Sequence, residues 1–185
     1  GTLARSGLFS SATISTGNAG NVQVATKRLL IRDGATINVG NFASHNPAIA
    51  PGQGAAGNLQ IDASIIQLDR GATLTANSAG GEQGNIILNS KLLVLRRGSS
   101  ISTNAIGSAT GGNILINTDF LVAVKTENSD ITSNSLSNRG GLIQITAQGV
   151  FGIEPRPQLT PFSDITVLSG RGLEFSGTIE LNTPD

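Results

Sequence analysis

The stretch Gly112-Asn113-Ile114-Leu115-Ile116 recurs in six versions along this 185-residue chain. Each version opens on glycine, usually continues with asparagine, and then alternates apolar residues with others. The remaining versions are Gly20-Asn21-Val22-Gln23-Val24, Gly57-Asn58-Leu59-Gln60-Ile61, Gly84-Asn85-Ile86-Ile87-Leu88, Gly141-Leu142-Ile143-Gln144-Ile145 and Gly177-Thr178-Ile179-Glu180-Leu181. Self-similarity at a period of tens of residues indicates a solenoid of stacked units.

The spacing of the copies is nearly constant in the middle of the chain. The four central copies begin 27, 28 and 29 residues apart, whereas the first and last intervals are 37 and 36 residues long. Both longer intervals contain prolines, near 41–56 and near 154–161. We interpret these two stretches as insertion loops, which stacked repeats tolerate well.

Like residues fall into columns when the copies are aligned. Residues two apart on a strand face the same side, so two aliphatic columns of the phrase should point into one core. Two further strand-like runs follow in each copy, separated by Gly, Asn, Asp and Ser. We therefore predict an all-β fold, a parallel β-helix solenoid of about six coils with three short strands per coil and little or no α-helix. The inward columns are Val22, Leu59, Ile86, Ile114, Ile143 and Ile179, and Val24, Ile61, Leu88, Ile116, Ile145 and Leu181.

Polar residues also align. The asparagines that open the copies, and a second column that includes Asp62, Asn89 and Asn117, should form ladders that satisfy backbone groups at the corners. Charged residues align with alternating sign, which predicts cross-coil ion pairs among Arg32, Asp69 and Arg96, and between Asp33 and Arg70. These columns are interpreted as structural.

Composition narrows the function classes. The 12 basic and 12 acidic residues give a net charge of zero, so we expect no nucleic-acid partner and no membrane insertion. There is no cysteine, tyrosine or tryptophan, and the low aromatic content disfavours a deep carbohydrate groove. The chain starts without Met and stops inside the sixth copy, so we expect residues 1–185 to be a single segment of a longer protein.

We interpret two features that resemble functional motifs as having no functional role. Residues 52–57 spell Gly-Gln-Gly-Ala-Ala-Gly, the dinucleotide fingerprint, but a proline-containing loop precedes it and a strand should follow, where the fingerprint needs a helix. His45, the only histidine, has no cysteine or second histidine to act with, and we interpret it as an exposed loop residue. The sequence predicts no cofactor.

Asp130 and Asp164 are the best candidates for a site, although weak ones. Each precedes an inward Ile and an outward Thr, so the two carboxylates should stack in adjacent coils. Such a pair is able to bind Ca²⁺ or to serve as acid and base in a glycan-cleaving enzyme. The alternative, which we favour, is that each carboxylate caps its local turn. We therefore predict no catalytic and no metal-binding residue.

The C-terminal half resembles a known family. The run Gly111-Gly112-Asn113-Ile114-Leu115-Ile116-Asn117-Thr118-Asp119-Phe120-Leu121-Val122-Ala123-Val124 and the phrases Glu127–Thr132 and Ser163–Thr166 resemble the repeat region of filamentous-haemagglutinin-like exoproteins of two-partner secretion systems, cyanobacterial ones above all. The resemblance covers residues 111–185. It implies a right-handed parallel β-helix rod that an outer-membrane transporter exports to the cell surface. Asn46-Pro47-Ala48-Ile49 does not match the family's transporter-recognition motif.

From these observations we expect a structural, non-enzymatic shaft module of a secreted, adhesin-like exoprotein. It would lie outside the cell or on the bacterial surface and present loops for adhesion or surface assembly. Unpaired strand edges at the two ends predict end-to-end self-association. The alternative function is a polysaccharide-cleaving β-helix enzyme, a lyase or glycosidase, that uses Asp130 and Asp164.

Overall fold

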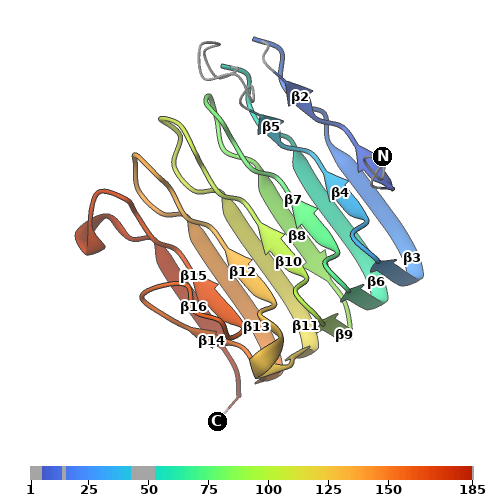
Figure 1. Ribbon diagram of the computed structural model, residues 1–185. Coiled ribbons are helices and arrows are strands. Elements are labelled where there is room, and N and C mark those ends of the chain that lie inside the picture. Colours follow the sequence, from blue (N-terminus) through green and yellow to red (C-terminus); the bar gives the residue numbers. More distant parts are fainter. Residues whose placement is uncertain (1–5, 14–15, 43–52, 185) are drawn as a thin grey trace.

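The chain folds almost entirely into parallel β-strands (Figure 1). The computed structural model describes residues 6–13, 16–42 and 53–184. The helical segments in this part are two short 3₁₀ turns, Lys125–Glu127 (η1) and Leu173–Phe175 (η2). The described residues include no helix that is both long and apolar enough to cross a membrane. The prediction of an all-β fold with almost no helix is confirmed.

Short strands form a seven-stranded parallel sheet. Their order across the sheet is Gly7–Phe9 (β1), Thr36–Asn38 (β4), Thr73–Thr75 (β7), Ser100–Ser102 (β10), Asp130–Thr132 (β12), Asp164–Thr166 (β15) and Glu154–Pro155 (β14). A further small pair joins Ala12–Thr13 (β2) to Asn41–Phe42 (β5).

Longer strands form the second parallel layer. Their order is Thr178–Asn182 (β16), Leu142–Phe151 (β13), Asn113–Ala123 (β11), Asn85–Asn89 (β8), Asn58–Asp69 (β6) and Val22–Arg32 (β3). Leu92–Leu95 (β9) also belongs to this layer, and both β8 and β9 pair with β6 on one side and β11 on the other. The four strands therefore form a closed ring of pairings, in the order β6, β8, β11, β9 and back to β6.

The predicted right-handed parallel β-helix solenoid with three short strands per coil is wrong. The strands instead make a closed set of four parallel strands and a seven-stranded parallel sheet, which do not amount to a clear right-handed β-helix. The first two runs of each predicted coil are usually one strand, such as β6 or β11. At the expected corner the pairing skips a single residue, as after Ala63 and Thr118, and then resumes in the same register, so the strand continues through it.

The predicted columns are confirmed by the strand register. Ile114 of β11 pairs with Ile86 of β8 and with Ile143 of β13, and all three side chains are fully buried. These aliphatic residues belong to the same apolar cluster as Leu74 and Ile131 of the seven-stranded sheet. The core is thus the space between the two layers, and burying each such side chain contributes about 1.5–3 kcal/mol.

The asparagine ladders are also confirmed. Asn113 Nδ2 donates to Asn85 Oδ1 at 2.9 Å, and Asn85 Nδ2 donates to Asn58 Oδ1 at 2.7 Å. In the second ladder Asn117 Nδ2 donates to Asn89 Oδ1 at 3.0 Å. Each amide therefore bridges neighbouring strands.

The ion pairs follow only part of the prediction. Arg70 lies 3.4 Å from Asp33, as expected for exposed residues in one column. Asp69, however, pairs with Arg97, whose Nε lies 2.8 Å from Asp69 Oδ1. Arg96 pairs with Glu127 at 2.7 Å, and this contact lowers the pKa of Glu127 to about 2.

A tight turn explains these different partners. Asp33, Arg70 and Arg97 occupy the same turn position and have φ of 57°, 51° and 50°, in the left-handed region. The next residue in each case is a glycine, at φ of 71–75°, where other residues would be strained. The left-handed turn redirects the side chains away from the directions that strand alternation predicts.

We expect Ile114→Ala to lower the free energy of unfolding by about 2–5 kcal/mol, because truncating a fully buried aliphatic side chain leaves a cavity. Leu115→Ala is the matched control. Leu115 is only partly buried and faces the other side of the same strand, so the expected loss is below about 1 kcal/mol. Urea unfolding followed by circular dichroism measures both, and equal losses would contradict the assigned faces.

Candidate functional site

The two aspartates singled out in the sequence lie on neighbouring strands. Asp130 begins β12 and Asp164 begins β15, and the following residues, Ile131 and Ile165, pair in register. The backbone N–H of Asp164 donates to Asp130 Oδ1 at 2.9 Å. The structure therefore brings the pair together as the column alignment predicts.

The Asp164 carboxylate is fully occupied by the 154–161 loop. Its side chain has no exposed surface, and it accepts hydrogen bonds from the Thr160 hydroxyl at 2.8 and 3.0 Å and from the Thr160 backbone N–H. Arg156 Nε lies 2.9 Å from Asp164 Oδ1. The Arg156 guanidinium also contacts Glu154 at 2.9 Å and lies 5.3 Å from the centre of the Phe162 ring. Asp164 thus fastens the loop to the sheet.

Asp130 is more open but has a structural contact of its own. Burial raises the pKa of Asp130, repulsion from Asp164 adds to the increase, and the hydrogen bond from the Asp164 backbone opposes it. Asp164 therefore makes local contacts of the kind that the capping interpretation expects, whereas Asp130 accepts its hydrogen bond from the neighbouring strand. Among the described residues there is no group of three or more His, Cys, Asp or Glu able to hold a metal ion.

The other sequence motifs lie largely outside the described residues. His45, Asn46-Pro47-Ala48-Ile49 and Gly52 are among them. The end of the Gly-rich motif is described, and the strand β6 follows it instead of a helix. At Gly57 an added Cβ would come 2.1 Å from the Gly20 carbonyl oxygen, so this glycine permits close stacking of neighbouring turns.

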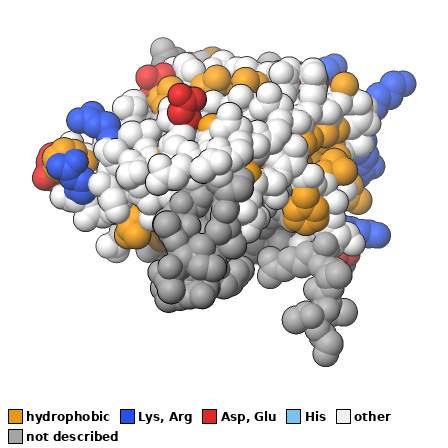
Figure 2. Space-filling view, turned by 90° about the horizontal axis from the view of Figure 1, so that it is seen from above, with side chains coloured by type: hydrophobic (Ala, Val, Ile, Leu, Met, Phe, Trp, Pro, Cys, Tyr) orange, Lys and Arg blue, Asp and Glu red, His pale blue; other side chains and the backbone are white. Residues whose placement is uncertain are grey.

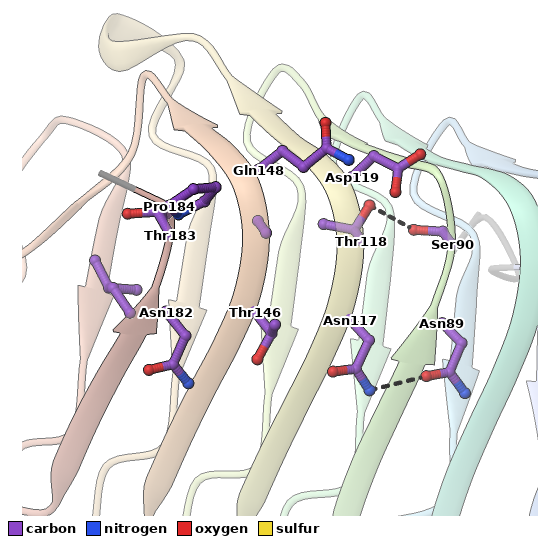
Figure 3. Close-up of a pocket in the computed structure, with 12 residues that line it drawn as sticks. Asn89, Ser90, Asn117, Thr118, Asp119, Thr146, Gln148, Asn182, Thr183 and Pro184 are labelled. Carbon is purple, nitrogen blue, oxygen red and sulfur yellow. Dashed lines mark hydrogen bonds between the residues drawn. The ribbon is translucent and has the colours of Figure 1, made fainter.

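A groove that the sequence reasoning missed crosses the long strands. Its cavity volume is about 860 Å³, and it runs over β8, β11, β13 and β16, perpendicular to the strands (Figure 3). The lining residues come from equivalent positions of successive strands: Asn89, Ser90, Asn117, Thr118, Asp119, Thr146, Ala147, Gln148, Leu181, Asn182, Thr183 and Pro184.

Amides and hydroxyls follow one another along the groove. Figure 3 shows Asn89, Asn117, Thr146 and Asn182 in a row, with Asp119 and Gln148 on the other side of a strip that includes Ser90 and Thr118. The Ser90 hydroxyl donates to the Thr118 hydroxyl at 2.9 Å. The groove therefore carries rows of polar, mostly uncharged side chains, together with apolar surface at Ala147, Leu181 and Pro184.

Some polar groups in the groove are unused. Within the described part of the chain, the Gln148 side chain makes no hydrogen bond and Asp119 makes no ion pair. Asn117 gives one amide hydrogen to Asn89 and retains another. These groups are available to a polar ligand.

An exposed aromatic pair borders the groove. Phe120 follows Asp119, pairs in register with Gly149, and its ring lies 6.4 Å from the ring of Phe151 at an interplanar angle of 32°. An added Cβ at Gly149 would lie 2.8 Å from the Phe151 ring and 3.4 Å from the Phe120 ring, so both rings cover this glycine. Phe120 and Phe151 are 41% and 55% exposed, so the two rings together form an exposed apolar surface.

One signal in the sequence could have located the groove. The small residues Ser90, Thr118 and Ala147 align in the repeats, and the regular alternation of burial breaks just after them. On β11 Thr118 is buried, Asp119 is partly buried and Phe120 is exposed, whereas strict alternation would bury Phe120. The strand bends at this point.

Comparisons of the chain with protein-family models, curated proteins and solved structures find no match. They do not link the chain to the filamentous-haemagglutinin-like exoproteins. The family resemblance therefore contributes only to the proposal that follows.

We expect Asp164→Asn to lower the free energy of unfolding by about 3 kcal/mol, because it removes the buried carboxylate that faces Arg156 and leaves this arginine only the exposed Glu154 as an acidic partner. Asp130→Asn is the matched control, since it keeps the oxygen that accepts the Asp164 N–H and removes a charge that burial disfavours. Its expected loss is below about 1 kcal/mol. Urea unfolding measures both, together with limited proteolysis of the 154–161 loop, and unchanged stability of Asp164→Asn would show that the loop is not held by this contact.

Proposed function

We propose that this chain is a structural, non-enzymatic module of a secreted, adhesin-like exoprotein, and that it presents loops at the cell surface. The observation that carries the proposal is the in-register stacking of like residues, from Val22 of β3 to Ile179 of β16. Such stacking places the loops that follow equivalent strands side by side at one end of the molecule (Figure 1).

The loops at one end of the strands are suited to contact another surface. Figure 2 views the molecule from this end and shows mostly uncharged surface, with Lys and Arg toward the two sides. Three aliphatic side chains in successive loops are strongly exposed: Ile106 at 52%, Leu136 at 65% and Leu173 at 74%. Apolar side chains gathered on exposed loops often mark protein or surface contacts.

The resemblance of residues 111–185 to two-partner secretion exoproteins supports the rest of the proposal. It favours export of the parent protein by an outer-membrane transporter and an extracellular or surface location. The zero net charge of the chain favours a role without nucleic acid.

A glycan-cleaving enzyme that uses Asp130 and Asp164 has less support. Asp164 is fully buried and saturated by Thr160 and Arg156. A general acid or nucleophile must reach the scissile bond, and this carboxylate has no open side.

We expect the triple variant Ile106→Ser, Leu136→Ser and Leu173→Ser of the full-length protein to fold normally but to reduce adherence of the cells that display it. The reason is that all three side chains are exposed at the loop ends. Retention of washed cells on a surface, together with antibody labelling of intact cells, measures adherence and display. A control variant, Leu8→Ser with Leu30→Ser, changes exposed leucines elsewhere. Equal adherence of the two variants, or labelling only after permeabilisation, would contradict the proposal.

The free edges of the layer of long strands should also pair with one another. β3 lies at one edge and carries exposed Lys27 and Arg28, whereas β16 lies at the other and carries exposed Glu180. Parallel pairing of β16 with β3 of a second copy would continue the stack. In the register of the layer Glu180 would lie opposite Gln23, four residues from Lys27, so its attraction to the basic edge acts at long range.

We expect the 185-residue chain to associate end to end as its concentration rises, and Glu180→Lys to weaken this association. Sedimentation velocity over a range of concentrations measures it, with Glu82→Lys on an exposed loop as the control for added positive charge. A monomer at every concentration, or the same weakening by both variants, would rule out the proposed edges.

A further inference from the structure

The groove over β8, β11, β13 and β16 has the dimensions of a site for a chain molecule. It is about 860 Å³ in volume and crosses four strands, so its length follows the stacking direction of the layer. Equivalent side chains repeat along it once per strand, at the interstrand spacing of about 4.8 Å. A ligand with repeated polar groups would meet a repeated set of partners.

The charge of the groove argues against an anionic ligand. Asp119 is the one charged side chain among its twelve lining residues. A nucleic acid or an acidic polymer needs Lys and Arg along its path, and a carboxylate in the groove would repel it. The lining instead offers neutral amides and hydroxyls, as at Asn117, Thr146 and Gln148.

The position of the groove argues against an extended peptide. Peptides that bind to sheets usually add a strand at an unpaired edge. The middle of the groove lies across β11 and β13, each of which is paired on both sides, and only its end over β16 reaches an edge strand. Side chains therefore supply the polar contacts of the groove.

The low aromatic content of the sequence disfavours a deep carbohydrate groove, but two of the six phenylalanines lie together near this groove, on an open sheet face. Phe120 follows the rim residue Asp119 on β11, Phe151 lies three residues after Gln148 on β13, and both rings are exposed to solvent. Flat apolar faces next to hydrogen-bonding groups suit a ligand that is amphipathic in the same way, such as a sugar ring with C–H groups on its faces and hydroxyls on its edge.

We infer that this groove binds a neutral oligosaccharide, with one sugar ring against Phe120 and Phe151 and the following sugars along Gln148, Asn117 and Asp119. The hydroxyls of the sugars donate to the Asp119 carboxylate and accept from the free amide hydrogens of Asn117 and Gln148. The inference goes beyond the proposed scaffold role, because it concerns a sheet face and needs none of the loop ends.

The test uses cellohexaose, maltohexaose and chitohexaose with the ¹⁵N-labelled 185-residue chain. At least one of these neutral hexasaccharides should shift the side-chain amide signals of Gln148 and Asn117 in ¹H–¹⁵N spectra. Phe120→Ala should weaken this binding about tenfold, the loss typical of removing one stacking ring. Gln148→Ala should also weaken it, and this change disturbs no hydrogen bond among the described residues.

The control variant is Phe9→Ala, which removes an equally exposed ring on the seven-stranded sheet. It should leave binding unchanged. The inference is overturned if none of the three sugars shifts the two amides, if Phe120→Ala and Gln148→Ala bind as tightly as the unchanged chain, or if polygalacturonate or a deoxythymidine hexamer binds more tightly. Normal adherence of cells that carry Phe120→Ala would leave the loop-based proposal intact, so the two proposals fail separately.

Discussion

Parallel pairing in strict register is the constraint on which the rest of this structure depends. Ile114 lies beside Ile86 and Ile143, so each of these side chains has a residue of the same type one interstrand spacing away. This arrangement stabilises the fold through aliphatic residues, which pack into a continuous core. It also stabilises the fold through asparagines, because each amide both donates and accepts a hydrogen bond. Stacked charges of one sign would repel, which accounts for the low charge of the chain.

The register could be predicted from the sequence, whereas the number of strands could not. Alignment of the repeated phrase fixes which residues are neighbours, as at Asp130 and Asp164, because one glycine marks the start of every copy. Whether a strand ends at a corner depends on backbone geometry that the residue types leave open. Asn117 and Asp119 are of turn-forming residue types, yet β11 continues through them.

The missed features share one physical origin, the departure of side chains from strict alternation. At Arg97 a left-handed turn directs the guanidinium to Asp69, so the pairing of Arg96 with Asp69 does not form. At Phe120 the bend of β11 exposes a ring that alternation would bury, and the same bend opens the groove beside it. Local residue propensities do not predict either change of side-chain direction, because both changes depend on how successive strands curve together.

The second asparagine ladder has a chemical direction. Asn117 donates to Asn89, and Asn89 donates to Asp62 at 2.7 Å, so every hydrogen points toward the N-terminal end of the stack. A carboxylate only accepts, and therefore Asp62 is able to receive this chain of hydrogen bonds but not to extend it to Ala25, its neighbour on β3. Asp62 thus acts as a terminator, and the two ends of the ladder differ in polarity although the strands that carry them are alike. An aspartate in such a column marks the N-terminal end of a row of aligned dipoles, so the two ends of an otherwise uniform stack are chemically different.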